Sequence, residues 1–362
     1  MKLARLKKRA RPEPKVRAPA LDEASKAGKR TVLIDASRSS RGWSRIGTFI
    51  KCPFKFALDQ RLGIRLIPAA ALTKGSLGHL LQAHQHAIWG AEQGGCWVDN
   101  EWVDDPDTLM LPEQAAIEWC RRNPEGVQYL QPMLEVFDDY MMRYPKAPKV
   151  LAVEHEISGV LGTKPHAETG EPVFGLWLEY LYDEVNHTMS VDEDITPTLL
   201  NCPGHPDHDK PIRLTRRIDL TTEERGGAVI WDHKHTSKVD PARADDAYAM
   251  DGGFTAFRIL GRQRWRNFSG LGLQLISNRK PYRVARPMIP ETPHKDINFA
   301  RMIYAYEHQV AQMDMMFPDA WDWPMAMNET VCMGRYGMCA AASRATPYCF
   351  YGSAVAEGDP RK

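Results

Sequence analysis

No apolar run in the 362 residues approaches the ~20 residues that a membrane-spanning helix needs. The basic N-terminal region also lacks the apolar stretch of a secretory signal. We therefore expect a cytoplasmic protein, whose seven cysteines are free, catalytic or metal-bound rather than paired in disulfides. With 43% hydrophobic and 26% charged residues, the chain has the composition of a globular protein with a buried core.

Acidic residues are missing from residues 252–290, which carry eight Lys/Arg. Residues 1–30 carry eleven Lys/Arg against three acids. Because the net charge is only +1, the rest of the chain must be strongly acidic. Confining positive charge to one tail and one internal segment is expected where a polyanion binds. A solubilising tail and a solvated helix face would produce the same pattern.

Internal repeats are also absent, and the periodicity changes once, after Pro145. Apolar spacing predicts helices at 45–62 (capped by Ser44 and kinked at Pro53), 76–91, 112–122, 128–143, 243–262 and 297–315. Enrichment in β-branched and aromatic residues predicts strands at 150–157, 173–184, 212–221, 228–233 and 270–278. Helices, then a block of strands, then a helix and a further strand predict an α/β or α+β core with a helical N-terminal cap.

Two aspartates and a lysine stand at the ends of two adjacent predicted strands. Asp219 ends the first strand, and Asp232 follows thirteen residues later near the end of the second. The connection through Gly226 and Gly227 predicts a tight antiparallel turn, for which these glycines supply positive φ. Two carboxylates at neighbouring strand ends can share one hard cation such as Mg²⁺. Lys234 points to the same face as Asp232, where it can orient a water or stabilise a phosphate. The alternative is that the two aspartates are ordinary acids at the sheet edge and that Lys234 is a surface lysine, with no shared metal site.

The segments RIDL (217–220) and IWDHKHTS (230–237) resemble the core of the RecB-like PD-(D/E)XK nucleases, which include phage exonucleases and CRISPR-associated exonucleases. KGSLGH (74–79) resembles the family's G-x-x-x-H motif, whose histidine joins the metal shell. VEHE (153–156) resembles the strand that supplies a further acid, for which Glu156 is our first choice and Glu154 the second.

This resemblance implies a central mixed sheet flanked by helices and a bound Mg²⁺ or Mn²⁺. The implied catalytic residues are Asp219, Asp232, Lys234 and Glu156, and the implied metal ligands are Asp219, Asp232, His79 and the His233 carbonyl. The polar composition of residues 1–40, rich in Pro, Lys and Arg, predicts a basic, disordered tail. The resemblance implies a single nuclease domain at 41–362. Within that domain, 41–145 is the helical part, 146–290 the catalytic core, and 291–362 a C-terminal helix and cysteine cluster.

Three cysteines, Cys332, Cys339 and Cys349, lie within eighteen residues, and Cys52 precedes Pro53 far upstream. This split resembles the iron–sulfur cluster site of the RecB-like exonucleases and implies a [4Fe–4S] cluster on all four thiolates. Zinc would fit the same ligands, and incidental buried cysteines are the alternative.

A stripe of arginines, Arg258, Arg262 and Arg266, recurs at intervals of four residues with Trp265 among the interleaved aromatics. Arginines that bind phosphate and aromatics that stack on bases predict a DNA-binding helix face. Aromatics facing the core and arginines facing water would give the same pattern.

The chain departs from the family pattern in the wider cysteine spacing, in Arg217 where a glycine is usual, and in segment 248–254, which lacks the glutamine that many relatives carry after the Asp-x-Lys strand. The segment between Glu156 and Asp219 is also longer than the core requires, and its loop 201–208 could bind zinc or simply turn. We expect a metal-dependent deoxyribonuclease, favoured as an exonuclease, with DNA and recombination or replication proteins as partners. The main alternative is a catalytically silent DNA-binding scaffold of the same fold. Another is a nucleic-acid adaptor whose cysteines bind a structural zinc ion.

Overall fold

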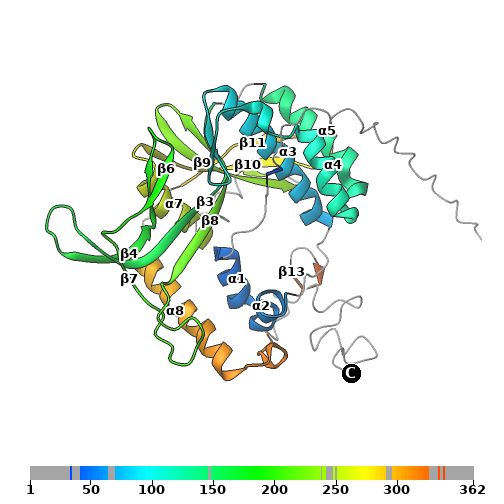
Figure 1. Ribbon diagram of the computed structural model, residues 1–362. Helices are drawn as coiled ribbons and strands as arrows, with labels where there is room; N and C mark the ends of the chain where they lie inside the picture. The colour runs from blue at the N-terminus through cyan, green and yellow to red at the C-terminus, as the bar shows by residue number, and fades with distance from the viewer. Residues whose placement is uncertain are drawn as a thin grey trace, which may run out of the picture.

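The computed structural model (Figure 1) describes residues 33–34, 41–63, 70–145, 148–237, 239–241, 248, 251–290, 296–325, 333–334 and 337–338. The helices are α1 (Trp43–Lys51), α2 (Pro53–Gln60), α3 (Ala70–Glu92), α4 (Pro112–Arg122), α5 (Val127–Arg143), α7 (Gly252–Arg264) and α8 (Asp296–Met316). Short 3₁₀ turns are η2 (Pro106–Thr108), η3 (Pro124–Gly126) and η4 (Ala320–Asp322). Among these described helices, none has the length and apolar character needed to cross a membrane.

A central mixed sheet has the strand order β11-β10-β9-β8-β3-β1-β2, with β4 and β7 also paired to β3 and β12 to β10. Its strands are β1 (Cys96–Val98), β2 (Glu101–Val103), β3 (Lys149–Pro165), β4 (Pro172–Leu178), β7 (Thr196–Pro197), β8 (Arg213–Glu224), β9 (Gly227–Thr236), β10 (Phe268–Ser277), β11 (Val284–Ala285) and β12 (Met288–Ile289). Two separate ribbons are β5 (Tyr180–Asp183) with β6 (Thr188–Val191), and β13 (Met333–Gly334) with β14 (Gly337–Met338). The predicted α/β fold is confirmed.

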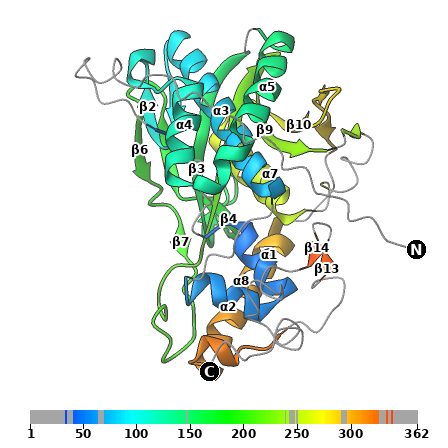
Figure 2. The same cartoon turned by 90° about the vertical axis from the view of Figure 1, so that its right-hand side faces the viewer.

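The sheet is mixed because its strands are joined in two ways. β3, β8 and β9 are successively antiparallel, whereas β10 runs parallel to β9 after a crossover through α7. Such a parallel connection requires a segment that returns along the sheet, and a helix is the usual one. In Figures 1 and 2, α3, α4 and α5 lie together at one end, and α1, α2 and α8 lie at the other.

Helices bury both faces of the sheet. On one face, Ala83 and Ala87 of α3 belong to the same buried cluster as Leu220 and Trp231. On the other, Leu260 of α7 packs in the largest buried cluster, which also contains Ile218 and Ile230. Adjacent residues of a strand point to opposite faces. β9 is therefore a central strand between α3 and α7, and the residues at its end are set by both helices.

The hairpin between β8 and β9 has a two-residue turn. Glu224 pairs with Gly227, and the turn residues Arg225 and Gly226 have φ of 53° and 82°. Positive φ at both turn positions fits the right-handed twist of a hairpin. Gly227, which we expected to share this role, instead begins β9 and is needed for space. A Cβ there would lie 1.7 Å from the Ser269 hydroxyl oxygen.

Some predicted boundaries were wrong. The predicted helix 45–62 is two helices, separated at Cys52, and α1 begins after Gly42 rather than after Ser44. The predicted strand 173–184 breaks at Glu179 into β4 and β5. The Glu179 carboxylate accepts hydrogen bonds from the Ser158 hydroxyl (2.6 Å) and the Arg213 Nε (2.7 Å). An inward-facing acid with these partners explains why the strand does not continue.

Candidate metal centre

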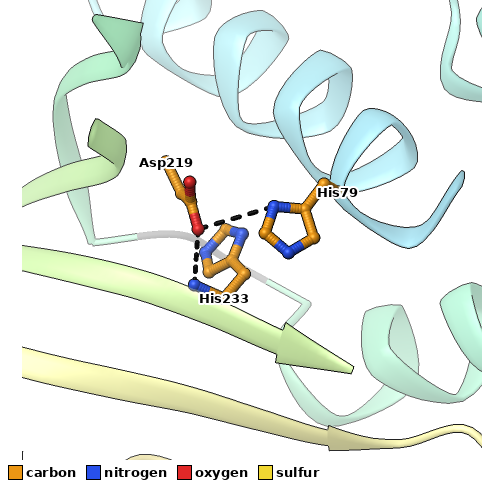
Figure 3. Close-up of side chains that lie close together, drawn as sticks. All are labelled: His79, Asp219 and His233. Carbon is orange, nitrogen blue, oxygen red and sulfur yellow. Dashed lines mark hydrogen bonds and ion pairs between the residues drawn. The ribbon is translucent and has the colours of Figure 1, made fainter. Parts of the chain in front are cut away.

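His79, Asp219 and His233 offer ligand atoms that all lie within 4.8 Å of one another. Figure 3 shows the His79 ring, carried by α3, facing the Asp219 carboxylate above β9. The His79 Nδ1 lies 3.5 Å from the Asp219 Oδ2, and the same oxygen accepts the backbone N–H of His233 at 2.6 Å. A carboxylate and two imidazoles in this arrangement can bind a divalent ion.

The site forms where regular strand pairing stops. The ladder between β8 and β9 runs up to the pair Leu220–Trp231, and beyond it the Asp219 side chain takes the next N–H, that of His233. Leu220 packs with α3, whereas Ile218 packs in the cluster that contains α7. Side-chain alternation is therefore broken at Asp219, and this carboxylate turns toward α3 and His79.

Asp232 and Lys234 form an ion pair beside this group. The Asp232 side chain is largely buried. Burial by itself lowers the pKa of Lys234, but the Asp232 and Asp219 carboxylates outweigh burial and raise the pKa. Burial raises the pKa of Asp219, with the nearby Asp232 acting in the same direction and His79 in the opposite one. The structure thus brings together the two acids and the lysine that the strand pattern singled out.

The third acid is placed differently from our first choice. In the pairing of β3 with β8, Val153 faces Leu220 and His155 faces Ile218, which sets Glu154 opposite Asp219. Glu156 pairs with Arg217 instead, and its backbone N–H donates to the Asn100 side chain at 2.9 Å. Glu154 is buried and has a φ of 46°. The register favours Glu154 over Glu156 as the acid next to Asp219, because a local irregularity in β3 decides which glutamate turns inward.

From the sequence, only the carbonyl of His233 was predicted to lie at the site, but its imidazole lies there as well. The ring centroid of His233 lies 5.8 Å from that of His79 and 5.4 Å from that of His86, and His235 lies 5.7 Å from His79. The spacing His-Lys-His was a usable signal, because residues 233 and 235 share a strand face. Gly78 permits the close approach, since a Cβ there would meet the His235 ring at 2.2 Å.

Burial disfavours the charged form of the His86, His233 and His235 rings, because it lowers the pKa of each. It lowers the pKa of His86 and of His235 to about 3, and that of His233 well below its ordinary value. A neutral imidazole has a lone pair available for a metal ion or a hydrogen bond. Two of the four rings already have protein partners, because the His86 Nε2 lies 3.0 Å from the Tyr140 hydroxyl and the His235 Nε2 lies 3.2 Å from the Gln82 Oε1.

The predicted arginine stripe does not form one exposed surface. Arg258 is only 6% exposed and pairs with Asp296 at 3.4 Å, and Trp265 is 8% exposed within the largest buried cluster. Arg262 and Arg266 are exposed. The prediction was wrong for Arg258 and Trp265, because α7 is buried on more than one side, between the sheet and other helices.

The loop at 201–208 uses its histidines for hydrogen bonds. The His205 Nε2 lies 3.2 Å from the Asp314 carboxylate, and its Nδ1 accepts the Asp207 N–H at 3.0 Å. The His208 Nδ1 lies 3.2 Å from the Leu200 carbonyl oxygen. Within the described ranges, no metal-competent group includes this loop. The polar turn, rather than the zinc site, is the interpretation that fits.

Of the cysteines proposed for the cluster, only Cys52 is described, and Cys332, Cys339 and Cys349 lie outside the described residues. Cys52 is the N-cap of α2, where its Sγ accepts the Lys55 N–H at 3.5 Å. Cys96 and Cys120 are free and buried, and burial raises the pKa of their thiols to about 12 and about 11. Those two behave as core residues.

The model of the PD-(D/E)XK nuclease superfamily matches residues 43–277, from the first residue of α1 to the last residue of β10. The chain therefore belongs to the PD-(D/E)XK nuclease superfamily. Members of this superfamily are mostly nucleases that use divalent metal ions. Comparison with curated proteins found no matching sequence.

Proposed function

We propose that the protein is a metal-dependent deoxyribonuclease that hydrolyses phosphodiester bonds and acts as an exonuclease. The observation that carries the proposal is the convergence of Asp219, Asp232 and Lys234 where the pairing of β8 with β9 stops, next to His79. The exonuclease assignment is supported by the resemblance of the same segments to the RecB-like enzymes.

The donor set fits a divalent cation. Asp219 supplies oxygen, His79 supplies an imidazole nitrogen, and buried Asp232 and Glu154 are further acids next to Asp219. We propose Mg²⁺ or Mn²⁺ as the ion, because carboxylate ligands suit both. A divalent ion held there would lower the pKa of a bound water and offset the charge of the phosphate.

Lys234 is the proton-bearing group of the site. The neighbouring carboxylates raise the pKa of its ammonium, so it carries its proton at neutral pH. Asp232 holds that ammonium through the ion pair. A fixed ammonium can donate to a non-bridging phosphate oxygen and stabilise the negative charge that grows there during hydrolysis.

The exposed Arg262 and Arg266 are proposed contacts to DNA phosphates. Phe268 pairs with Ala228 and Leu275 pairs with Lys234. These arginines therefore lie toward the opposite end of the strands from Lys234, about 20 Å away at ~3.3 Å per residue. That span corresponds to about six base pairs of duplex at ~3.4 Å each. Their proposed role is to hold DNA away from the cleavage point, not to contact the scissile phosphate.

A [4Fe–4S] cluster on Cys52, Cys332, Cys339 and Cys349 remains a proposal. Two contacts near Cys52 support it. The Phe54 N–H donates to the Pro324 carbonyl at 3.1 Å, and Met325 packs on the same apolar cluster as Cys52. The segment that precedes Cys332 in the chain therefore ends, at Met325, beside the helix that Cys52 caps. Iron and acid-labile sulfide content of protein purified without oxygen tests this, and zinc in their place would contradict it.

The decisive experiment compares wild type with Lys234→Ala on end-labelled linear DNA and on circular DNA, with Mg²⁺ or Mn²⁺. We expect the substitution to slow hydrolysis about 10²–10³-fold, the loss typical of removing one charge-stabilising donor. Lys149→Ala is a matched control, because Lys149 is a lysine of the same sheet that pairs with Glu223 at 3.1 Å. Equal rates for wild type and Lys234→Ala would contradict the proposed role of Lys234.

Cleavage of circular DNA would indicate endonuclease activity. DNA binding without hydrolysis would indicate a catalytically silent scaffold protein.

A further inference from the structure

We propose that the imidazole of His233 is itself a metal ligand, so that the site binds its ion through two imidazoles and selects Mn²⁺ over Mg²⁺. This inference rests on the proposed function only for the identity of the site. It concerns which ion the site prefers and by which atoms.

The geometry places the His233 ring at the site. Its ligand atom lies within 4.8 Å of those of His79 and Asp219, a spacing that one ion can bridge. In Figure 3 the His233 ring lies between the Asp219 carboxylate and the His79 ring, while its backbone nitrogen is bonded to Asp219. That backbone hydrogen bond holds the main chain of residue 233 against Asp219.

The His233 ring is buried and lacks a protein partner for one nitrogen. His233 is 1% exposed, and its Nε2 has no hydrogen-bond partner among the described residues. A buried polar atom without a hydrogen-bond partner is unfavourable, and a bound ion would offset that cost. His235, on the same strand face, also has one unpartnered ring nitrogen, its Nδ1, while its Nε2 lies 3.2 Å from the Gln82 Oε1. Within the described residues, His233 is the better candidate of the two, because its ligand atom lies close to those of both His79 and Asp219.

The chemistry of the donors sets the expected preference. Mg²⁺ favours oxygen ligands and retains several waters, whereas first-row transition ions accept imidazole nitrogen readily. A site with two imidazoles among its ligands is thus better matched to Mn²⁺ than to Mg²⁺. Without the His233 ring, His79 would be the single imidazole, and the carboxylates would make the site suitable for either ion.

The test is spectroscopic and does not depend on catalysis. Mn²⁺ is added to the full-length protein, and pulsed electron paramagnetic resonance counts the coupled histidine nitrogens, with histidine labelled by ¹⁵N. We expect two coupled imidazoles in wild type and one in His233→Leu. We also expect Mn²⁺ affinity to fall at least tenfold in His233→Leu while Mg²⁺ affinity changes less than about threefold.

His235→Leu is the matched control, because it removes a buried imidazole from the same strand face and should retain both couplings. A single coupled nitrogen in wild type would overturn the proposal, and this outcome needs no variant that might fail to fold. Equal Mn²⁺ affinities of wild type and His233→Leu would also overturn it. Nuclease activity is measured separately. Two couplings without any DNA hydrolysis would uphold this site while rejecting the proposed function.

Discussion

The helices α3 and α7 both pack on the central sheet, yet they contribute opposite kinds of side chain. α3 brings His79 to the Asp219 carboxylate, and it brings Gln82 and His86 to His235 and His233 near the end of β9. α7 looked functional because of its arginines, but it brings Phe257 and Leu260 to the core. In these two helices, the residues that can serve a site are set by which side chains the helix brings to the sheet, not by how many charged residues the helix carries.

The arginines of α7 show this directly. Arg264 has a side chain that is 2% exposed, lies 3.7 Å over the Tyr182 ring and pairs with Glu184. Arg258 is buried against Asp296. In both cases the charge is used to hold elements together. Conversely, α3 brings the His79 ring to the Asp219 carboxylate and the buried His86 ring to His233, which is the arrangement of a metal site.

The largest loss of activity is expected on the face of the sheet that α3 covers. Asp219→Asn removes the carboxylate that contacts both His79 and the His233 backbone, so we expect metal affinity to collapse and hydrolysis to fall at least ~10³-fold. Calorimetric metal titration and end-labelled DNA assays measure this. Glu223→Gln, at the other end of β8, serves as the control and should behave as wild type. An active Asp219→Asn protein would show that α3 and β8 do not form the working site.

The next effect distinguishes a structural histidine of α3 from the site histidines. The His84 Nε2 accepts the Ile34 N–H at 3.1 Å, and its Nδ1 lies 2.8 Å from the Met110 carbonyl oxygen. Burial lowers the pKa of His84 from 6.5 to about 4. Because the pKa of His84 is lower in the folded state than in the unfolded state, the stabilisation from the neutral ring is fully present above pH 6.5. It is lost as the pH falls toward 4. The loss reaches about 3 kcal/mol of unfolding free energy.

Denaturant unfolding with chelator between pH 8 and pH 4 checks this for wild type and His84→Gln. The glutamine variant should be about 1 kcal/mol less stable at pH 8 but should lose less stability on acidification. Parallel pH profiles for the two proteins would mean that His84 does not contribute this dependence.

A smaller effect is expected where α7 uses an arginine structurally. Arg264→Ala removes a buried guanidinium stacked on Tyr182, and we expect a loss of about 2 kcal/mol in unfolding free energy. Affinity for DNA should be unchanged at a temperature where the variant is folded. Reduced DNA affinity with unchanged stability would reverse the roles that we assign to the two helices.

The smallest effect concerns the exposed arginines of α7. Arg262→Ala combined with Arg266→Ala should leave stability within about 0.5 kcal/mol of wild type. DNA affinity should fall. The slope of the logarithm of affinity against the logarithm of salt concentration should become shallower by about two, one for each DNA phosphate that an arginine no longer neutralises. Fluorescence anisotropy at several salt concentrations measures this. An unchanged slope would confine DNA binding to other parts of the surface.

Much of the site could be predicted from local pattern. Alternation within a strand placed Asp232 and Lys234 on one face, and a glycine-containing connection predicted the hairpin that sets Asp219 beside them. The choice between Glu154 and Glu156 could not be made in this way. It depends on a positive φ at Glu154 and on the pairing with β8, which are properties of the folded sheet.

The sequence by itself determined the fold class, the hairpin and the pair of aspartates with their lysine, because these depend on periodicity and turn chemistry over short stretches. Tertiary structure alone decided that the His233 imidazole joins His79, and that Arg258 and Trp265 are buried. The physical reason is that burial depends on what packs against each face, and the helices that cover β9 come from segments on either side of it in the chain.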